Sequence, residues 1–502
     1  MKHWSFITTV AVSAATTGAI TGSAQADELK SKGYNVLFIA IDDLNDWVGC
    51  LGGNPQAITP NFDRFAKQQA MVMNKAYCPS TVCCPTRSAL LTGKRVSSTG
   101  VYGNGQNLKN AAKAKDVVTL PEYFAKHGYH TLSAGKIFHK HPTADGLDEG
   151  QWAFQEFARP GGGTKGMLWE QTPPPVEGVK AGGTDFAWGA CKAPVEETKD
   201  YVACKWAADQ LQRDFAGKPF FLALGISKPH LPWYVPQEFF DMYPLEKLIP
   251  VEIFRDDLDD IVRNDGRPIF KPDPRFLLAD KANMHKEAQR AYLANISYVD
   301  YCIGVLFDAL AKSKYADNTI VMIWGDHGWH LSEKMKYGKT DLWEESARVP
   351  FIVRVPGMTQ PDFKCEGVVN LLDMYPTLVE LCGLPPNAEN EGRSFVPLLK
   401  NPKMEWNTPT LTTYQYKNHS LTDGRHRYTW YGGKANGAEE LYDHSSDPLE
   451  HKNLAANPEY KEIIARFKEY LPMHDEPDSP RNKLSGADKK KMTKGDKQSD
   501  DE

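Results

Sequence analysis

The run Cys83-Cys84-Pro85-Thr86-Arg87 places a thiol, a proline and an arginine close together, and Gly93 follows a short stretch of helix formers. Proline suits the first position of a helix and glycine its end, so we expect Cys83 just before a helix N-terminus. Such an end carries partial positive charge and free N–H groups, which suit an oxyanion. The spacing predicts a nucleophile beside an anion site, with Arg87 one turn away. The alternative is a buried vicinal cysteine pair.

Acidic residues follow two apolar runs of the chain. Asp42 and Asp43 come directly after the first run, and Asp326 follows a later one together with His327. Neighbouring residues within a strand point to opposite faces, but at a strand end the chain turns and both carboxylates can face one cation. Three carboxylates offer hard oxygen ligands, which favour Ca²⁺ or Mg²⁺ over softer metals. For the Asp-Asp pair alone, a helix cap or a solvated turn is the alternative.

Short apolar runs indicate the elements that must position these residues. Residues 35–41, 219–226 and 318–324 are typical of fully buried strands, and residues 350–355 extend the pattern. Amphipathic segments between them, such as 120–127 and 288–312, predict helices, so we expect an α/β fold with a large mixed, mainly parallel sheet sandwiched by helices. In open sheets of this class, sites form beyond the carboxyl ends of the strands. Residues hundreds of positions apart are therefore expected to converge on one pocket.

Composition and charge limit the classes of function. The chain has 502 residues, 41% hydrophobic content and a net charge of −5, so it can bury a large core and lacks the basic excess typical of nucleic-acid binding. Residues 1–26 combine a positive start, an apolar run and Ala24-Gln25-Ala26, which predicts a cleaved secretory signal and a periplasmic or secreted protein. No later stretch reaches the roughly 18 apolar residues of a membrane span.

We expect three further parts in the mature chain. Residues 27–400 are predicted to form the catalytic domain, and residues 401–473 change character to shorter, polar-alternating strands and one helix, typical of a small α+β subdomain with an antiparallel sheet. Residues 474–502 are charged and nearly free of large apolar side chains, which predicts a disordered tail.

Residues 83–93, CCPTRSALLTG, resemble the signature of type I, formylglycine-dependent sulfatases, and the register picks Cys83 as the residue oxidised to formylglycine. The resemblance covers about residues 34–454. It is closest to the iduronate-2-sulfatase-like branch of the alkaline phosphatase superfamily, which implies an alkaline-phosphatase-like fold. It rests also on residues 41–44 (IDDL), 134–139 (AGKIFH), 228–230 (KPH), 326–329 (DHGW) and 440–443 (ELYD).

The resemblance also implies the parts of the active site. One Ca²⁺ per subunit would have these ligands: Asp42, Asp43, the modified Cys83, Asp326 and His327. Six side chains would be catalytic: Cys83, Arg87, Lys136, His139, His230 and Lys339. By this resemblance, Lys136 would contact the sulfate and His139 would take the proton when formylglycine sulfate collapses. His230 would contact the oxygen of the leaving group. Lys339, twelve residues past His327, matches a second sulfate-binding lysine.

These features predict a sulfuric ester hydrolase that acts on a sulfated polysaccharide or its oligosaccharides through a formylglycine hydrate and a bound divalent cation. The implied partners are the sulfated carbohydrate and a formylglycine-generating or maturase enzyme that converts Cys83. Two alternatives stay open. One is a phosphodiester or phosphonate monoester hydrolase of the same superfamily, and the other is a sulfated-glycan binding protein without catalysis.

Overall fold

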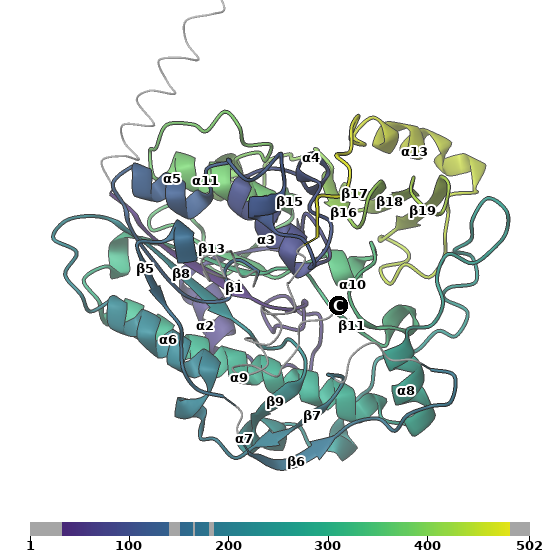
Figure 1. The fold of residues 1–502 in the computed structure, drawn as a ribbon, viewed down its shortest axis with the longest axis horizontal. Coiled ribbons are helices and arrows are strands. Elements are labelled where there is room, and N and C mark those ends of the chain that lie inside the picture. Colours follow the sequence, from purple (N-terminus) through teal and green to yellow (C-terminus); the bar gives the residue numbers. More distant parts are fainter. Residues whose placement is uncertain (1–32, 140–150, 164–165, 180–184, 482–502) are drawn as a thin grey trace, which may run out of the picture.

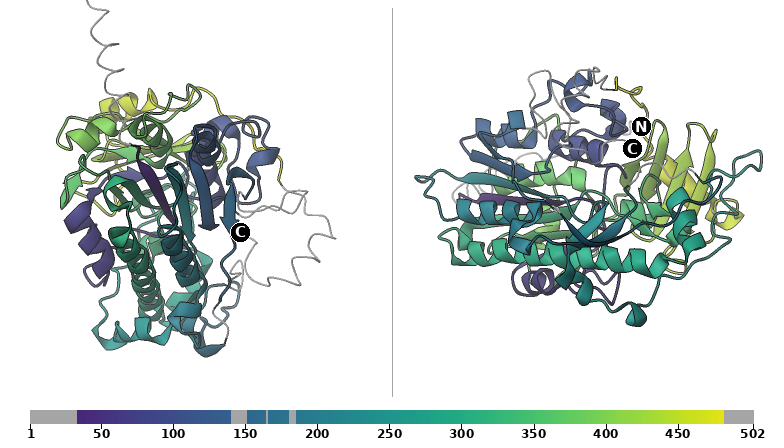
Figure 2. Two further views of the ribbon diagram at one scale, coloured as in Figure 1. Left: turned by 90° about the vertical axis from the view of Figure 1, so that its left-hand side faces the viewer. Right: turned by 60° about the horizontal axis from the view of Figure 1, so that its bottom comes forward.

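The first apolar run forms the centre of the main sheet. β1 (Asn35–Ile41) pairs in parallel with β10 (Thr319–Gly325) on one side and with β8 (Phe220–Ile226) on the other, and all three strands are buried along their length. This computed structural model describes residues 33–139, 151–163, 166–179 and 185–481, so the predicted signal segment lies outside the described residues. Helices cover both faces of the sheet (Figures 1 and 2), which is why its central strands are continuously apolar.

The main sheet has eight strands, in the order β14-β2-β13-β10-β1-β8-β4-β5. The other five are β14 (Phe363–Cys365), β2 (Met71–Met73), β13 (Phe351–Arg354), β4 (His130–Gly135) and β5 (Glu156–Ala158). β13, which corresponds to the fourth apolar run, is antiparallel to both β10 and β2, while the remaining neighbours are parallel. The predicted mixed, mainly parallel sheet is thereby confirmed.

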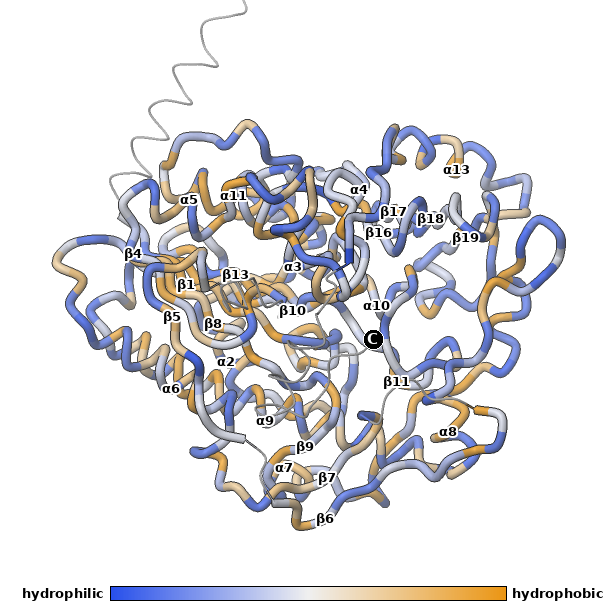
Figure 3. The backbone as a smooth tube through the Cα atoms, in the orientation of Figure 1, coloured by the Kyte–Doolittle hydropathy of each residue, from blue (hydrophilic) through white to orange (hydrophobic). Residues whose placement is uncertain are grey.

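Alternate residues of β1 belong to two separate cores. Leu37 and Ile39 pack with the layer of α2 (Pro60–Gln69), α6 (Lys199–Gln210) and α9 (His285–Lys312). Val36 and Phe38 pack on the other face with α3 (Cys83–Thr92), α5 (Leu120–Lys126), α11 (Met374–Leu381) and α12 (Val396–Lys400). Figure 3 shows hydrophobic positions gathered along these central elements. Within the described chain, α9 alone is long and apolar enough to cross a membrane, and 78% of its apolar window is buried inside the protein.

A second, antiparallel sheet follows the main sheet in sequence and lies beside α10 (Glu344–Ala347) (Figure 1). Its strands are β16 (Thr410–Thr413), β17 (Asn418–Thr422), β18 (His426–Tyr431) and β19 (Ala438–Asp443), and α13 (Lys461–Lys468) packs on it. The buried Arg427 of β18 pairs with Glu344 of α10 and with Glu450, so charged groups join this sheet to the core. The predicted smaller C-terminal subdomain with an antiparallel sheet is thereby confirmed.

The smaller elements complete the fold. Short strands form three minor sheets: β6 (Met167–Gln171), β7 (Trp188–Cys191) and β9 (Trp233–Pro236); β11 (His330–Leu331) and β12 (Tyr337–Gly338); β15 (Val369–Asn370) and β3 (Ala76–Tyr77). Within the described residues, the remaining α-helices are α4 (Val96–Thr99), α7 (Gln237–Asp241) and α8 (Pro274–Ala282), and short 3-10 turns lie between the elements.

The first residues of the predicted tail lie against the segment that follows α3. The backbone N–H of Glu476 donates to the carbonyl of Ser97 at 2.7 Å, and that of Ser479 donates to Gly100 at 2.8 Å. Gln106 donates in turn to the carbonyl of Ser479 at 2.8 Å. Residues 482–502 lie outside the described residues.

Candidate active site

The helix that carries the predicted nucleophile begins earlier than the sequence suggested. α3 starts at Cys83 itself, preceded by the extended Val82, and Pro85 occupies its third position instead of its first. Proline is tolerated there because the N–H groups of the first turn have no helical acceptor. Gly93 ends the helix with φ 69°, as predicted. Cys83 therefore stands in the first turn of the helix, where the free N–H groups and partial positive charge lie.

The thiol of Cys83 lies between a histidine and a lysine. Its Sγ is 3.1 Å from Nε2 of His327 and 3.1 Å from Nζ of Lys339, and it is fully buried. Burial raises the pKa of this thiol far above its ordinary value, although Lys136 and Lys339 oppose the effect. The unmodified side chain is therefore a neutral thiol at neutral pH.

The three predicted carboxylates meet beside Cys83. Asp43 has a left-handed backbone conformation, with φ 60°, immediately after β1 ends, and Asp tolerates this region better than most residues. The turn brings both neighbouring carboxylates to one side, and the N–H of Asp43 donates to Oδ1 of Asp326 at 3.1 Å. The Oδ2 atom of Asp43 is buried and makes no hydrogen bond. A buried oxygen without a donor is the feature expected of a cation ligand.

Three cations pair with these carboxylates. Arg87 donates from Nε to Asp326 at 2.8 Å and from Nη2 to Asp42 at 3.3 Å. Lys136 lies 2.6 Å from Asp42, and Lys339 lies 2.6 Å from Asp43. Burial alone would raise the pKa values of Asp42 and Asp43. The nearby cations outweigh this effect and hold both pKa values below the ordinary range. The site therefore keeps fully charged groups of both signs in a buried place, where water screens them little.

His327 completes a set of possible metal ligands. One ligand atom from each of Asp42, Cys83, Asp326 and His327 lies within 4.8 Å of the others. Nδ1 of His327 lies 3.0 Å from the carbonyl of Gly328, which can only accept, so Nδ1 carries the proton and Nε2 offers a lone pair. Burial lowers the pKa of His327, which keeps the imidazole neutral. This set contains two carboxylates, and Asp43 adds a third beside it, with Oδ1 3.5 Å from Nε2 of His327. Three carboxylates and one imidazole fit a hard divalent cation such as Ca²⁺.

Glycines bring Lys136 to this cluster. Gly135 at the end of β4 has φ 74°, and a Cβ there would lie 2.0 Å from the carbonyl oxygen of Gly225 on β8. A Cβ on Gly225 would in turn lie 2.1 Å from the carbonyl oxygen of Lys136. The two strand ends can approach this closely only without side chains. The carbonyl of Lys136 then accepts from Arg87, which ties this segment to α3.

The structure brings nine of the ten predicted side chains into one connected group. Exposure separates two layers: Lys136, Lys339 and His230 are 17%, 12% and 30% exposed, whereas Arg87 is fully buried. The exposed three therefore line the open side, and Nε2 of His230 lies 4.0 Å from Oδ2 of Asp43. His139 is half-buried, three residues past Lys136, and is outside the close groups of His, Cys and acidic ligand atoms found in the described chain.

Sequence reasoning missed the residue that holds the turn at Asp43. The hydroxyl of Tyr292, in the first third of α9, donates to the carbonyl of Asp43 at 2.7 Å and accepts from the N–H of Asn45 at 2.9 Å. Tyr292 is fully buried and is surrounded in the sequence by ordinary core residues. No local pattern marks it, because its role depends on the packing of α9 against the end of β1.

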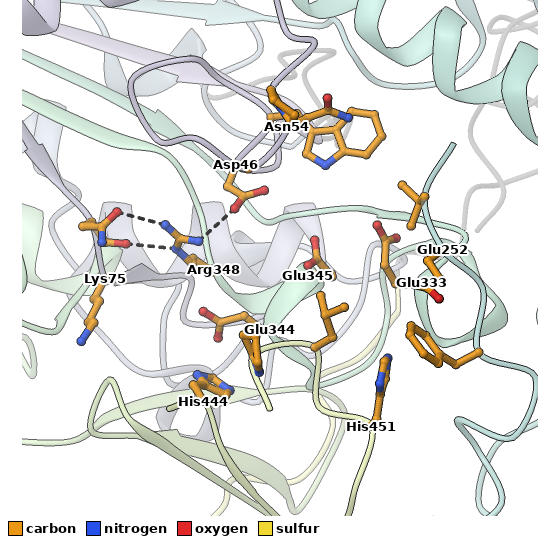
Figure 4. A pocket seen from close by; sticks show the side chains of 18 of the residues that line it. Asp46, Asn54, Lys75, Glu252, Glu333, Glu344, Glu345, Arg348, His444 and His451 are labelled. Atoms are coloured by element: carbon orange, nitrogen blue, oxygen red, sulfur yellow. Dashed lines mark hydrogen bonds and ion pairs between the residues drawn. The ribbon is translucent and has the colours of Figure 1, made fainter. Parts of the chain in front are cut away.

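A cavity of the described chain lies away from this cluster. It has a volume of about 780 Å³ and lies between the loop after β1, α10 and the C-terminal sheet. None of the ten predicted residues lines it. Figure 4 shows carboxylates of Asp46, Glu333, Glu344 and Glu345 among its side chains. Lys75, Arg348 and Arg425 line the same cavity, so its charge is mixed. Because none of the predicted residues faces it, the nine-residue cluster around Cys83, and not this cavity, is the candidate active site.

Comparison with known proteins gives two family matches. The sulfatase family profile matches residues 34–384, which is well over half of the chain. A second profile, described as the C-terminal region of N-sulphoglucosamine sulphohydrolase, matches residues 325–476. The two matches together span the main sheet and the C-terminal antiparallel sheet.

Similar proteins agree with these matches. A sulfatase of Formosa agariphila is 37% identical over 87% of this chain and 86% of its own length. Human iduronate 2-sulfatase is 27% identical, with 84% of this chain and 90% of that protein covered. Among solved structures, a 2-O GAG sulfatase has a TM-score of 0.64 at 22% identity, covering 88% of this chain and 91% of that one. The phosphonate monoester hydrolase of Agrobacterium radiobacter has a TM-score of 0.68 at 19% identity, covering 87% and 94%.

Proposed function

The chain belongs to the sulfatase family, and we propose that it hydrolyses sulfate esters of a sulfated polysaccharide or its oligosaccharides. The observation that carries the proposal is the position of Cys83, whose Sγ lies 3.1 Å from both His327 Nε2 and Lys339 Nζ in the first turn of α3. A nucleophile at that place faces an anion site built from two lysines and a helix N-terminus. Its chemistry is that of a sulfuric ester hydrolase.

The chain's own cations bind and orient the ester. Within the cluster, Lys136 and Lys339 carry partly exposed ammonium groups, so they reach the sulfate oxygens. The buried Arg87 pairs with Asp42 and Asp326 and holds these two carboxylates in place. Fixed charges in a place with little water stabilise the charge that develops on these oxygens without rearranging. His230 stands on the open side with Nε2 directed inward, where it donates a proton to the leaving alkoxide. His139 is assigned the proton that leaves when the sulfated nucleophile collapses.

Two groups that the chain would acquire complete this chemistry. Formylglycine at position 83 would supply, as its hydrate, one hydroxyl to attack sulfur and a second to expel sulfate. A Ca²⁺ ion would supply positive charge beside that hydrate, and Asp42, Asp43, Asp326 and His327 would hold it with position 83. The buried oxygen of Asp43 that lacks a hydrogen bond supports this assignment. A formylglycine-generating or maturase enzyme is the partner that this account requires.

Export is part of the proposal. Residues 1–26 act as a cleaved signal that delivers the enzyme to the periplasm or the medium, where sulfated glycans are met. Relatives named iduronate 2-sulfatase and Δ4,5-hexuronate-2-O-sulfatase support a 2-O-sulfated uronate as the first substrate to try.

The test is sulfate release from a panel of defined sulfated glycans, beside an aryl sulfate, an aryl phosphodiester and an aryl phosphonate. We expect sulfate release from at least one glycan, and sulfate ester turnover faster than that of either phosphorus ester. Faster phosphodiester or phosphonate turnover would support the hydrolase alternative. Glycan binding without release, by protein whose position 83 is converted, would support the binding-protein alternative.

A further inference from the structure

The loop that carries His230 is anchored by a buried carboxylate from another element. Asp200, in the first turn of α6 and 3% exposed, accepts the backbone N–H of Ser227 at 2.9 Å through Oδ1 and that of Lys228 at 2.9 Å through Oδ2. The two carboxylate oxygens thus accept hydrogen bonds from two consecutive residues just after the end of β8. An anchor of this kind fixes the direction in which the chain leaves the strand.

The side chain of Lys228 holds the same loop from inside. Its Nζ donates to the carbonyl of His230 at 3.2 Å and to the carbonyl of Pro232, so one ammonium group bridges two points of the turn. The indole N–H of Trp233 closes the loop by donating to the carbonyl of Pro229 at 2.7 Å. The ammonium group of Lys228 therefore acts on the backbone at His230 and Pro232.

These bonds determine which nitrogen of His230 can reach the ester. Nδ1 lies 2.7 Å from the carbonyl of Leu231, which can only accept, so Nδ1 carries a proton in either charge state of the ring. Nε2 is then the nitrogen that exchanges a proton, and it faces Asp43 Oδ2 at 4.0 Å. The position of the Leu231 carbonyl depends on the loop that Asp200 and Lys228 hold.

We propose that Asp200 and Lys228 are positioning residues that aim Nε2 of His230 at the leaving-group oxygen, without touching the substrate themselves. The inference rests on the proposed sulfatase function and deepens it, because it assigns protonation of the leaving group to one loop. A poor leaving group, such as a sugar alcohol or an alkylphenol, needs that proton to depart. A nitrophenolate departs without it, so only the first kind of ester depends on the aim of His230.

The test compares kcat/KM for phenyl sulfate with kcat/KM for 4-nitrophenyl sulfate in Asp200→Asn and Lys228→Met. We expect a fall of about tenfold to a hundredfold for phenyl sulfate and less than about threefold for 4-nitrophenyl sulfate, since misplacing an acid by about 1 Å can remove much of its contribution. The matched controls are Asp209→Asn and Lys205→Met, the same changes in an exposed ion pair on the same helix, for which both rates stay unchanged.

A double substitution separates positioning from loss of fold. In a His230→Gln background the acid is absent, so adding Lys228→Met or Asp200→Asn leaves the ratio of the two rates unchanged. Equal losses for both esters, or unchanged ratios in the single variants, would overturn the inference. So would a further change of the ratio in the His230→Gln background. If the wild-type protein with converted position 83 releases sulfate from neither ester nor from the glycan panel, the proposed function itself fails, and that outcome is distinct.

Discussion

Replacing Lys339 by methionine removes one positive charge from the site while keeping an unbranched side chain of similar length. The ammonium group lies 3.1 Å from Cys83 Sγ. A sulfate ester attacked by the side chain at position 83 therefore places its charged oxygens about 4 Å from this ammonium group. Two unit charges about 4 Å apart interact by about 4 kcal/mol at an effective dielectric constant of about 20. Only the part that grows toward the transition state accelerates the reaction, so we expect kcat/KM to fall by about 10²-fold to 10³-fold.

Lys336→Met is the matched control for this substitution. Lys336 lies three residues away in the same segment and is similarly exposed, at 13% against 12%, but its Nζ pairs with Asp341 at 3.0 Å and not with the cluster around Cys83. Losing this pair lowers the stability of the fold. We expect kcat/KM to stay within about threefold of the wild-type value, because the ammonium group that is removed does not face the ester. The assay is the initial rate of sulfate release from an aryl sulfate, with the fraction of formylglycine measured in each preparation. A loss below about fivefold in Lys339→Met, or an equal loss in Lys336→Met, would refute the reasoning.

Three further predictions concern stability. Arg427→Met leaves the buried Glu450 and the partly buried Glu344 without their cation, so it should lower the free energy of unfolding by about 3–5 kcal/mol. Arg425→Met, in a pair whose arginine is 61% exposed, should change the free energy of unfolding by less than about 1 kcal/mol. Urea unfolding measures both variants, and equal effects would contradict the buried network. Arg427 and His444 lower the pKa of Glu450 to about 2, against burial, so its stabilising effect is complete above its ordinary pKa and is lost as pH falls toward 2. Glu450→Gln should flatten this acid limb, and an unchanged slope between pH 5 and 3 would exclude the pairing. Chelation of divalent cations should lower the unfolding midpoint and abolish turnover, with Ca²⁺ restoring both; full recovery with Zn²⁺ alone would contradict an oxygen-rich site.

Local sequence patterns predicted the elements that position the site because those elements are strongly apolar. The run 35–41 forms β1 with the predicted bounds, and Gly93 ends α3 as expected. The start of α3 was misplaced because proline is compatible with any position of the first turn, so Pro85 alone does not fix the first residue. β13 shows a similar limit, because an apolar run carries no information on the direction of the strand.

The parts of the site that escaped prediction depend on contacts between distant elements. Tyr292 and Asp200 lie on α9 and α6, and each acts by a hydrogen bond to the backbone of a loop hundreds or tens of residues away. Single residues of this kind produce no periodicity and no motif. The left-handed turn at Asp43 was expected only as a general reversal at a strand end, and its conformation follows from the bonds that Asp326 and Tyr292 make to it.

The most direct test of the account measures the initial rate of sulfate release against the fraction of formylglycine at position 83, determined by mass spectrometry in preparations that differ in conversion. The account predicts a rate proportional to that fraction and no turnover by Cys83→Ala, whose fold remains intact by circular dichroism. A rate independent of conversion, or turnover retained by Cys83→Ala, would contradict the central role of this side chain.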